Sequence, residues 1–254
     1  MKVIEYHAGE PCWIGLGTAD ATTAAAFYGA MLGWVCPEGP AEHGGFRTCL
    51  LDGTPVGGMG ATRGEAPQGW RTYFSVRDVE ETIAKVQSAG GAVILPATDV
   101  GDAGRLAVLS DDQGAPFGLW QPLAFAGIGV KNVPGSFAWC ELISDSVDKS
   151  AEFYGVVFGW GLAAPSPGDP SGRREWLLDG RAIAGVMPRP AAMPPEMKPY
   201  WDVFFEVADV ARAVETASSN GATVLLPSLQ IGHGEIAVFF DPTGAIFSVV
   251  KPIT

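Results

Sequence analysis

Cysteine and histidine are the side chains that most often bind transition metals or act as nucleophiles and bases, and the sequence has four cysteines and three histidines. No two cysteines have C-x-x-C spacing, and none has a partner at zinc-ligand spacing. We therefore expect no zinc site and no disulfide framework, and we predict a cytoplasmic protein whose cysteines pack as core or bystander residues. We expect the histidines in loops, with His233 a candidate acid or base at a pocket rim. The residues are Cys12, Cys36, Cys49, Cys140, His7, His43 and His233.

Composition and charge exclude several classes of function. The chain has 254 residues, 47% hydrophobic, which is enough apolar material for a compact core. Its net charge of -12 disfavours nucleic acid and anionic membranes as partners. No stretch is long enough to span a bilayer, and residues Met1 to Pro11 contain no apolar run, so we expect no signal peptide. Glycine-rich phosphate loops and nucleophile elbows are absent from the sequence.

The chain contains two copies of one module. Residues Pro11 to Trp34 align without a gap on Phe137 to Trp160, at an offset of 126 (139 − 13). Both segments contain the sequence FYG followed by GW, and an LLDG tetrapeptide recurs at Leu50 and Leu177. We therefore place a first module at 1–124, a linker at 125–136 and a second module at 137–254.

Both copies predict the same order of elements. A strand is followed by a helix that ends at glycine, and a hairpin follows with a tight Asp-Gly turn. A further strand, a second amphipathic helix and two closing strands complete each module. The helices are expected at 21–31, 79–88, 147–158 and 210–219.

These repeated motifs, together with an Asp-Pro-x-Gly turn at Asp241, resemble the vicinal oxygen chelate superfamily of glyoxalases, bleomycin-resistance proteins and extradiol dioxygenases. The form is most similar to the tandem-module, antigen-like and "hydroxylase" branch of that superfamily. The resemblance implies an α+β fold in which two tandem βαβββ-type modules form a curled, cup-shaped mixed sheet with helices outside. It also implies a divalent metal bound by histidine and glutamate on particular strands.

The implied metal positions hold unsuitable residues in this chain. The histidine position that lies fourteen residues before the FY pair holds Trp13 and Trp139, and an indole cannot ligate a cation. The glutamate position near each closing strand falls at Gly118 and Ser248, and the remaining histidine position holds Arg71 and Asp202. We therefore predict no metal and no other cofactor, although a register shift of two residues would make Glu141 a ligand.

Alternation along the strands places small or basic groups of one half and acidic groups of the other half inside the cup, which predicts an asymmetric pocket rather than two equal sites. We predict Glu141 and Asp202 as catalytic acid or base groups, and as an alternative expect them to pair with Arg71 or with buried backbone donors. The proline-rich stretch from Pro188 to Pro199 is a candidate rim or lid, or an ordinary surface loop. The predicted ligand-binding residues are Trp13, Arg71, Tyr73, Trp120, Trp139, Phe204, Glu206 and Ser248, and Gly15 and Val250 are expected to face inward with them.

The sequence favours a metal-independent protein that binds a hydrophobic, aromatic small molecule as a monomer or homodimer. It leaves open whether this protein is a natural-product tailoring enzyme or a drug-sequestering resistance protein. Two further alternatives remain: a metal-dependent dioxygenase or glyoxalase-like lyase, and a non-catalytic regulatory protein.

Overall fold

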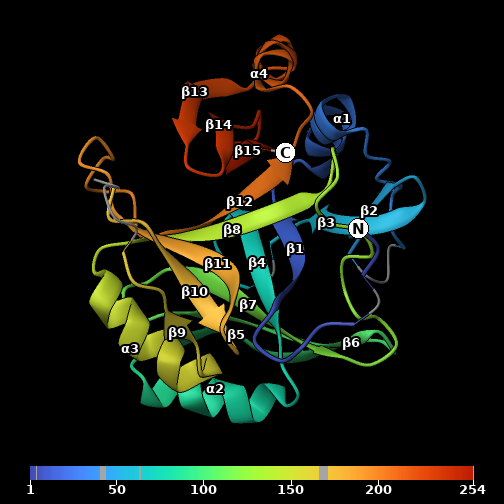
Figure 1. The fold of residues 1–254 in the computed structure, drawn as a ribbon. Coiled ribbons are helices and arrows are strands. Elements are labelled where there is room, and N and C mark those ends of the chain that lie inside the picture. Colours follow the sequence, from blue (N-terminus) through green and yellow to red (C-terminus); the bar gives the residue numbers. More distant parts are fainter. Residues whose placement is uncertain (4, 41–43, 63, 166–170, 254) are drawn as a thin grey trace.

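Two open, curled sheets with helices on their outer sides make up the computed structural model (Figure 1). The structure describes residues 1–254 apart from residues 4, 41–43, 63, 166–170 and 254. A seven-stranded sheet comes from the first half of the chain and an eight-stranded sheet from the second half. The predicted α+β fold with two tandem cup-shaped modules is confirmed, whereas the boundaries drawn at 124 and 136 stay predictions.

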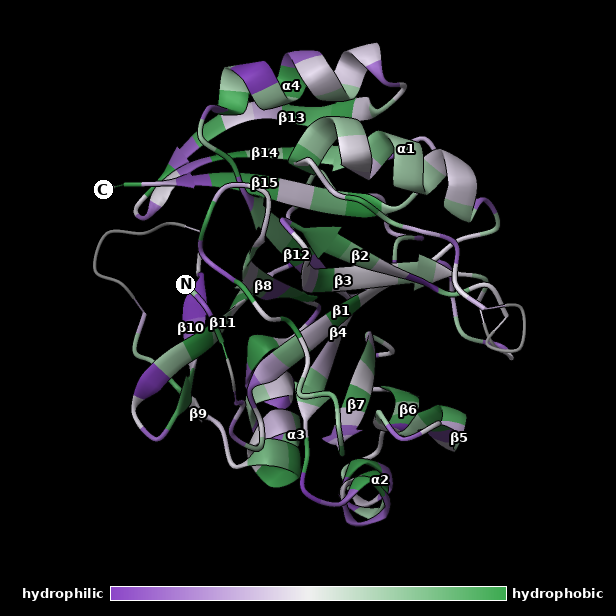
Figure 2. Ribbon diagram, turned by 90° about the vertical axis from the view of Figure 1, so that its right-hand side faces the viewer, coloured by the Kyte–Doolittle hydropathy of each residue, from purple (hydrophilic) through white to green (hydrophobic). Residues whose placement is uncertain are grey.

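The first module forms a mixed sheet in the order β2-β3-β1-β4-β7-β6-β5. Strands β1 and β4 are antiparallel neighbours at its centre, while β3 and β7 pair with them in parallel. Figure 2 shows β2 and β3 on one side of this centre and β5 and β6 on the other. The elements are β1 (Pro11–Gly17), α1 (Ala21–Leu32), β2 (Arg47–Leu51), β3 (Thr54–Gly60), β4 (Gly69–Ser75), α2 (Val79–Ser88), β5 (Ala92–Val100), β6 (Gly104–Ser110) and β7 (Pro116–Pro122).

The second module repeats this order and adds one short edge strand. Its sheet runs β13-β14-β15-β12-β8-β11-β10-β9, with β8 and β12 antiparallel at the centre. The elements are β8 (Phe137–Ser144), α3 (Val147–Phe158), β9 (Gly161–Leu162), β10 (Arg174–Leu178), β11 (Arg181–Pro188), β12 (Tyr200–Glu206), α4 (Val210–Ser219), β13 (Thr223–Ile231), β14 (Gly234–Phe240) and β15 (Ile246–Pro252).

The first helix of each module begins at a capping residue and ends at a glycine. Asp20 and Ser146 cap α1 and α3 by accepting hydrogen bonds from backbone N–H groups in the first turn. Gly33 and Gly159 end the same helices with φ values of 75° and 73°, in the left-handed region that favours glycine. Strands β5 and β13 were not predicted, because Pro96 and Pro227 interrupt their pairing and weaken the strand pattern.

The two modules pack together through the faces of their sheets that lie opposite the cups. The Tyr28 hydroxyl donates a hydrogen bond of 2.9 Å to Asp241 of the other module, and Tyr154 donates one of 3.2 Å to Asp111. Trp70 and Trp201 in turn donate to the two tyrosine hydroxyls. The tyrosine of each FYG motif therefore locks onto the Asp-x-x-Gly turn of the other copy, and this reciprocal pairing gives both repeated motifs a structural role.

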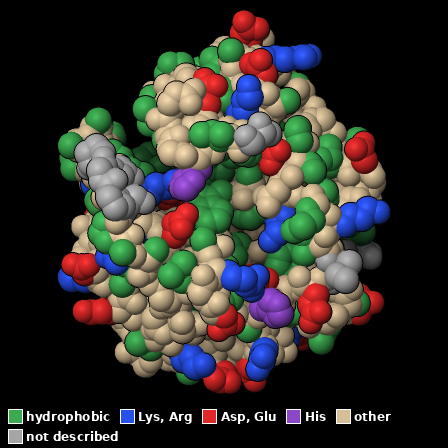
Figure 3. Space-filling model, viewed as in Figure 1, with side chains coloured by type: hydrophobic (Ala, Val, Ile, Leu, Met, Phe, Trp, Pro, Cys, Tyr) green, Lys and Arg blue, Asp and Glu red, His purple; other side chains and the backbone are tan. Residues whose placement is uncertain are grey.

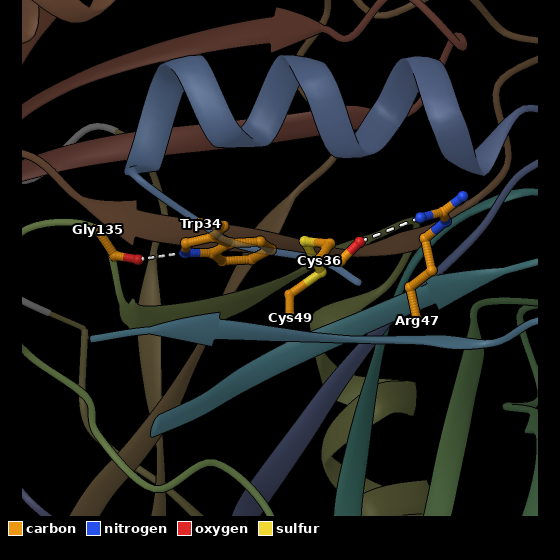
Figure 4. Close-up of a disulfide and its surroundings, with 5 residues drawn as sticks. All are labelled: Trp34, Cys36, Arg47, Cys49 and Gly135. Carbon is orange, nitrogen blue, oxygen red and sulfur yellow. Dashed lines mark hydrogen bonds between the residues drawn. A yellow bond between two sulfur atoms is a disulfide. The ribbon is translucent and has the colours of Figure 1, made fainter. Parts of the chain in front are cut away.

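Cys36 and Cys49 form a disulfide, so the prediction of four unpaired cysteines is wrong for this pair (Figure 4). An isolated bridge between Val35 and Leu50 brings the segment after α1 alongside β2 and places the two cysteines opposite each other. Their Cα atoms are 4.2 Å apart. A separation of 13 residues with no motif spacing concealed this pairing in the sequence. Cys12 and Cys140 are free and fully buried, as expected.

The segment between the modules is ordered and joins them to the N-terminal residues. Ile128 donates a backbone hydrogen bond to Cys12, and Gly129 donates one to Pro55, each 2.8 Å long. Within the described residues, no helix is both long enough and apolar enough to cross a membrane.

Candidate ligand-binding site

The concave face of the first sheet encloses a cavity of about 580 Å³, within the range of small-molecule sites. Its walls are mainly aromatic and aliphatic, and four predicted ligand-binding residues, Trp13, Arg71, Tyr73 and Trp120, line it together. Other lining residues include Phe46, Phe125, Leu106 and Val108. Trp13 stacks edge-to-face on Phe125 at 5.1 Å, which holds one wall rigid. That these residues bind a ligand stays a prediction.

Small residues on the central strands keep this cavity open. Gly58, Gly15 and Arg71 stand side by side on β3, β1 and β4, so two of the three neighbouring positions on the cup floor lack a side chain. The Tyr73 ring leans across Gly15, where an added Cβ would lie 3.2 Å from its Cε2 atom. The ring also covers Gly118, and a Cβ added there would overlap it. Glycine at these positions lets the tyrosine ring lie flat on the floor.

Arg71 places a guanidinium group at the cavity wall, where few hydrogen bonds compensate its charge. The side chain is 5% exposed, and Nη2 donates a 2.9 Å hydrogen bond to the carbonyl of Pro67. Its Nε is buried and has no hydrogen-bond partner. In the described part of the chain, no carboxylate lies within 4.0 Å of this guanidinium.

The second cup carries carboxylates at the corresponding floor positions. Gly185, Glu141 and Asp202 stand side by side on β11, β8 and β12, and Glu141 forms an ion pair with Arg173. The alternative that pairs these acids with Arg71 is wrong, because no ion pair joins them among the described residues. The prediction of one asymmetric pocket is also wrong, because Arg71 and the acids lie on different sheets. Figure 3 shows a hollow with hydrophobic side chains between the β13–β15 strands and the β10–β11 strands, with charged and histidine side chains at its edge.

Asp202 is the carboxylate of this cup best suited to exchange a proton near neutral pH. Burial raises its pKa to about 7, and the Glu141 carboxylate adds to the rise. Ser248 donates a 2.6 Å hydrogen bond to Oδ2, and this bond lowers the pKa of Asp202. Oδ1 is buried without a partner. Phe204 neighbours Trp139 and Ser248 in strand register, and the buried indole nitrogen of Trp139 also lacks a partner.

The remaining predicted residues lie nearer the edge. Glu206 is half-buried at the end of β12, where it is the register partner of Val250. Burial raises the pKa of Glu206, and the N-terminal ammonium group partly offsets this rise. His7 is exposed, His233 is exposed with Nε2 3.9 Å from Glu175, and His43 lies outside the described residues. The proline-rich segment is anchored at one end by an ion pair of Arg189 with Asp145.

Sequence reasoning missed Phe46 and Arg173, which are equivalent residues of the two copies. Counting back from the LLDG repeat, position 46 corresponds to position 173 at an offset of 127 (177 − 50). Phe46 covers Gly58 in the first cup, whereas Glu141, the partner of Arg173, covers Gly185 in the second cup. The LLDG repeat indicates that these two residues are equivalent. The segments before them differ in length between the copies, so the offset of 126 residues no longer applies there.

The donor set of neither cup fits the divalent metal of the superfamily. In the first cup the three positions hold an indole, a guanidinium and Gly118, and the Tyr73 ring occupies the space that a glutamate at 118 would need. In the second cup Asp202 is the one carboxylate among the three, and Ser248 already donates to it. Among the described residues, no three histidine, cysteine, aspartate or glutamate side chains converge on one point.

Sequence comparisons place both modules in one superfamily. Residues 136–249 match the "Glyoxalase/Bleomycin resistance protein/Dioxygenase superfamily", and residues 13–120 match a "Glyoxalase-like domain". "Putative glyoxylase CFP32" of Mycobacterium tuberculosis is 34% identical over 99% of this chain and 98% of its own length. "Anthracycline biosynthesis protein DnrV" of Streptomyces peucetius is 31% identical, covering 97% of this chain and 94% of its own.

Solved structures with the same fold include a Mn(II)-bound glyoxalase and a dioxygenase. The Mn(II)-bound glyoxalase from Novosphingobium aromaticivorans superposes with a TM-score of 0.62 at 15% identity, over 96% of this chain and 82% of that one. The 2,3-dioxygenase LapB from Pseudomonas sp. KL28 gives 0.64 at 16% identity, over 100% and 94%. The repeated motifs, the paired cups and these matches together show that the chain belongs to the glyoxalase/bleomycin resistance protein/dioxygenase superfamily.

Proposed function

We propose that the chain binds a planar aromatic small molecule in the first cup and does so without a divalent metal. The observation that carries the proposal is the cavity of about 580 Å³, in which aromatic rings surround a floor cleared by glycine. Flat ligands bury large apolar areas against such rings, and a few polar groups fix their orientation. The relative named for anthracycline biosynthesis supports this ligand class, because anthracyclines are planar polycyclic aromatics.

The donor set supports binding without a metal. Trp13, Arg71 and Gly118 offer no anionic or neutral lone pair at the positions where the superfamily holds its ion. Arg71 also places a positive charge there, which repels a second cation.

The test combines metal analysis with a titration. Protein purified without chelator is analysed for bound metals and then titrated with anthraquinone-2-carboxamide, an uncharged planar probe, while tryptophan fluorescence is followed. We expect substoichiometric metal and saturable quenching at one probe per chain, because Trp13 and Trp120 line the cavity. Stoichiometric metal, or quenching that does not saturate, contradicts the proposal.

Catalysis in the second cup is a second candidate function, favoured by the acidic pair of Glu141 and Asp202. Asp202 has a pKa near neutrality and a buried oxygen without a partner, which are properties of general acids and bases. Its test is product formation from a bound aromatic substrate, followed by mass spectrometry. A catalytic role requires that Asp202→Asn abolishes turnover while the probe still binds.

A further inference from the structure

A buried arginine without a counter-charge is the most unusual polar feature of the first cup. Arg71 is 5% exposed, and among the described residues its Nε has no partner and its one hydrogen bond goes to the neutral carbonyl of Pro67. Burying a charged group is costly unless an opposite charge or a full set of hydrogen bonds compensates it. The folded chain alone therefore leaves the guanidinium undercompensated, which is the state expected of a group that binds an anion.

The arginine of the second cup, unlike Arg71, has a carboxylate partner. There the half-buried Arg173 pairs with Glu141, which stands at the position that Gly15 occupies in the first cup. Where the second cup has a carboxylate of its own, the first cup has Gly15 with the Tyr73 ring across it, and Arg71 lines the cavity beside them. A carboxylate supplied by a ligand would approach the guanidinium from the cavity.

Two acidic residues also line the cavity, and their positions leave Arg71 available. Asp99 is paired with Arg105 at 2.8 Å, on the exposed edge formed by β5 and β6. Asp102 is exposed in the turn between these strands, where water screens its charge. Neither carboxylate lies within ion-pairing distance of Arg71.

We propose that the first cup selects aromatic ligands that carry a carboxylate, which the Arg71 guanidinium binds while the rings pack against the aromatic wall. The inference rests on the proposed function and adds the chemical class of the ligand. A guanidinium matches a planar carboxylate with parallel N–H donors, and such charge-assisted hydrogen bonds are stronger than neutral ones. Because Nε is buried and has no partner among the described residues, the folded chain leaves the charge of this guanidinium undercompensated, while Arg71 lines the cavity.

The experiment compares two probes that differ in one group. Anthraquinone-2-carboxylate and anthraquinone-2-carboxamide share the ring system, and both are titrated into the full chain by calorimetry at pH 7.5. We expect the carboxylate to bind about tenfold more tightly or better. Arg71→Met should weaken the carboxylate about 10- to 100-fold and change the amide less than about threefold. Arg77→Met, the same substitution at an exposed position, is the matched control and should change neither.

The outcomes separate the inference from the proposed function. Equal affinity of the two probes for the wild type, or an equal loss for both in Arg71→Met, overturns the carboxylate inference and leaves aromatic binding intact. No binding of either probe overturns both. The wild-type comparison tests the carboxylate inference even if Arg71→Met does not fold. Arg71→Lys then keeps the positive charge but loses the planar guanidinium, so it should weaken carboxylate binding less than removal of the charge would.

Discussion

The two cups have the same strand register and opposite chemistry. In the first, Gly58, Gly15 and Arg71 stand side by side on a floor kept open by glycine, and in the second the same places hold Gly185 and two acids. In the second cup the half-buried Arg173 pairs with a carboxylate of the same cup, whereas in the described part of the first cup the buried Arg71 has no such partner. Duplication thus preserved the scaffold while the charge of each floor diverged, and a chain with two cups can offer two different sites.

The largest difference between the cups should appear in the pH dependence of stability. The Asp202 pKa of about 7 lies above its ordinary 3.8, so the folded chain binds this proton more tightly than the unfolded chain does. The resulting stabilisation is complete below about pH 4 and is lost as pH rises to about 7, a change of about 4 kcal/mol. Urea unfolding from pH 4 to 8 should show this decline together with a smaller one from Asp111, because burial raises the pKa of Asp111 to about 6. Asp202→Asn should remove the part that Asp202 contributes. Asp179→Asn, at an exposed turn, should leave it. An unchanged slope in Asp202→Asn would refute the assignment.

Removing the arginine of each cup should change stability in opposite directions. Arg173→Met removes the ion pair between Arg173 and the buried Glu141, and we expect a loss of about 2–4 kcal/mol in the free energy of unfolding. Arg71→Met removes an undercompensated charge, so stability should hold or rise by about 1 kcal/mol. Chemical denaturation of both variants measures the difference. Similar losses in both would show that Arg71 has structural compensation.

The modules also differ in how the segment after the first helix is held. The first module joins Cys36 to Cys49, and the second pairs Leu162 with Trp176 at the corresponding places. Closing a loop of this length is worth about 3 kcal/mol, so Cys36→Ser with Cys49→Ser should cost about 2–3 kcal/mol. Thermal unfolding with and without reductant measures the effect. A wild type insensitive to reductant would argue against the bond.

Where the modules are alike, matched variants should behave alike. Tyr28→Phe and Tyr154→Phe each remove two buried hydrogen bonds, one to an aspartate of the other module and one from a tryptophan, and each should cost about 2 kcal/mol. Denaturant midpoints of the two variants provide the comparison. A cost in one and none in the other would break the structural equivalence of the two motifs.

The internal repeat determines which features of the fold and of the site could be predicted from the sequence. A gapless match from Pro11 to Trp34 set the register of β1, and the family resemblance placed Arg71 at a ligand position of β4. Alternation then placed Trp13, Arg71 and Tyr73 on one face. The pairing of Glu141 with Arg173 could not be predicted in this way, because the two residues are separated by a helix and a loop of unequal length in the two copies. The cavity itself depends on how rings settle over glycine, as Tyr73 does over Gly118, and that is a property of packing rather than pattern.

The most direct test of the account is to fill each cup in turn. Leu106 and Ile236 occupy equivalent places, opposite Trp120 and Val250 in strand register, and Leu106 lines the cavity. Calorimetric titration with anthraquinone-2-carboxamide should show about tenfold or greater loss of affinity in Leu106→Trp and wild-type affinity in Ile236→Trp. The reverse result, with binding lost in Ile236→Trp alone, would place the ligand in the acidic cup and contradict the central claim.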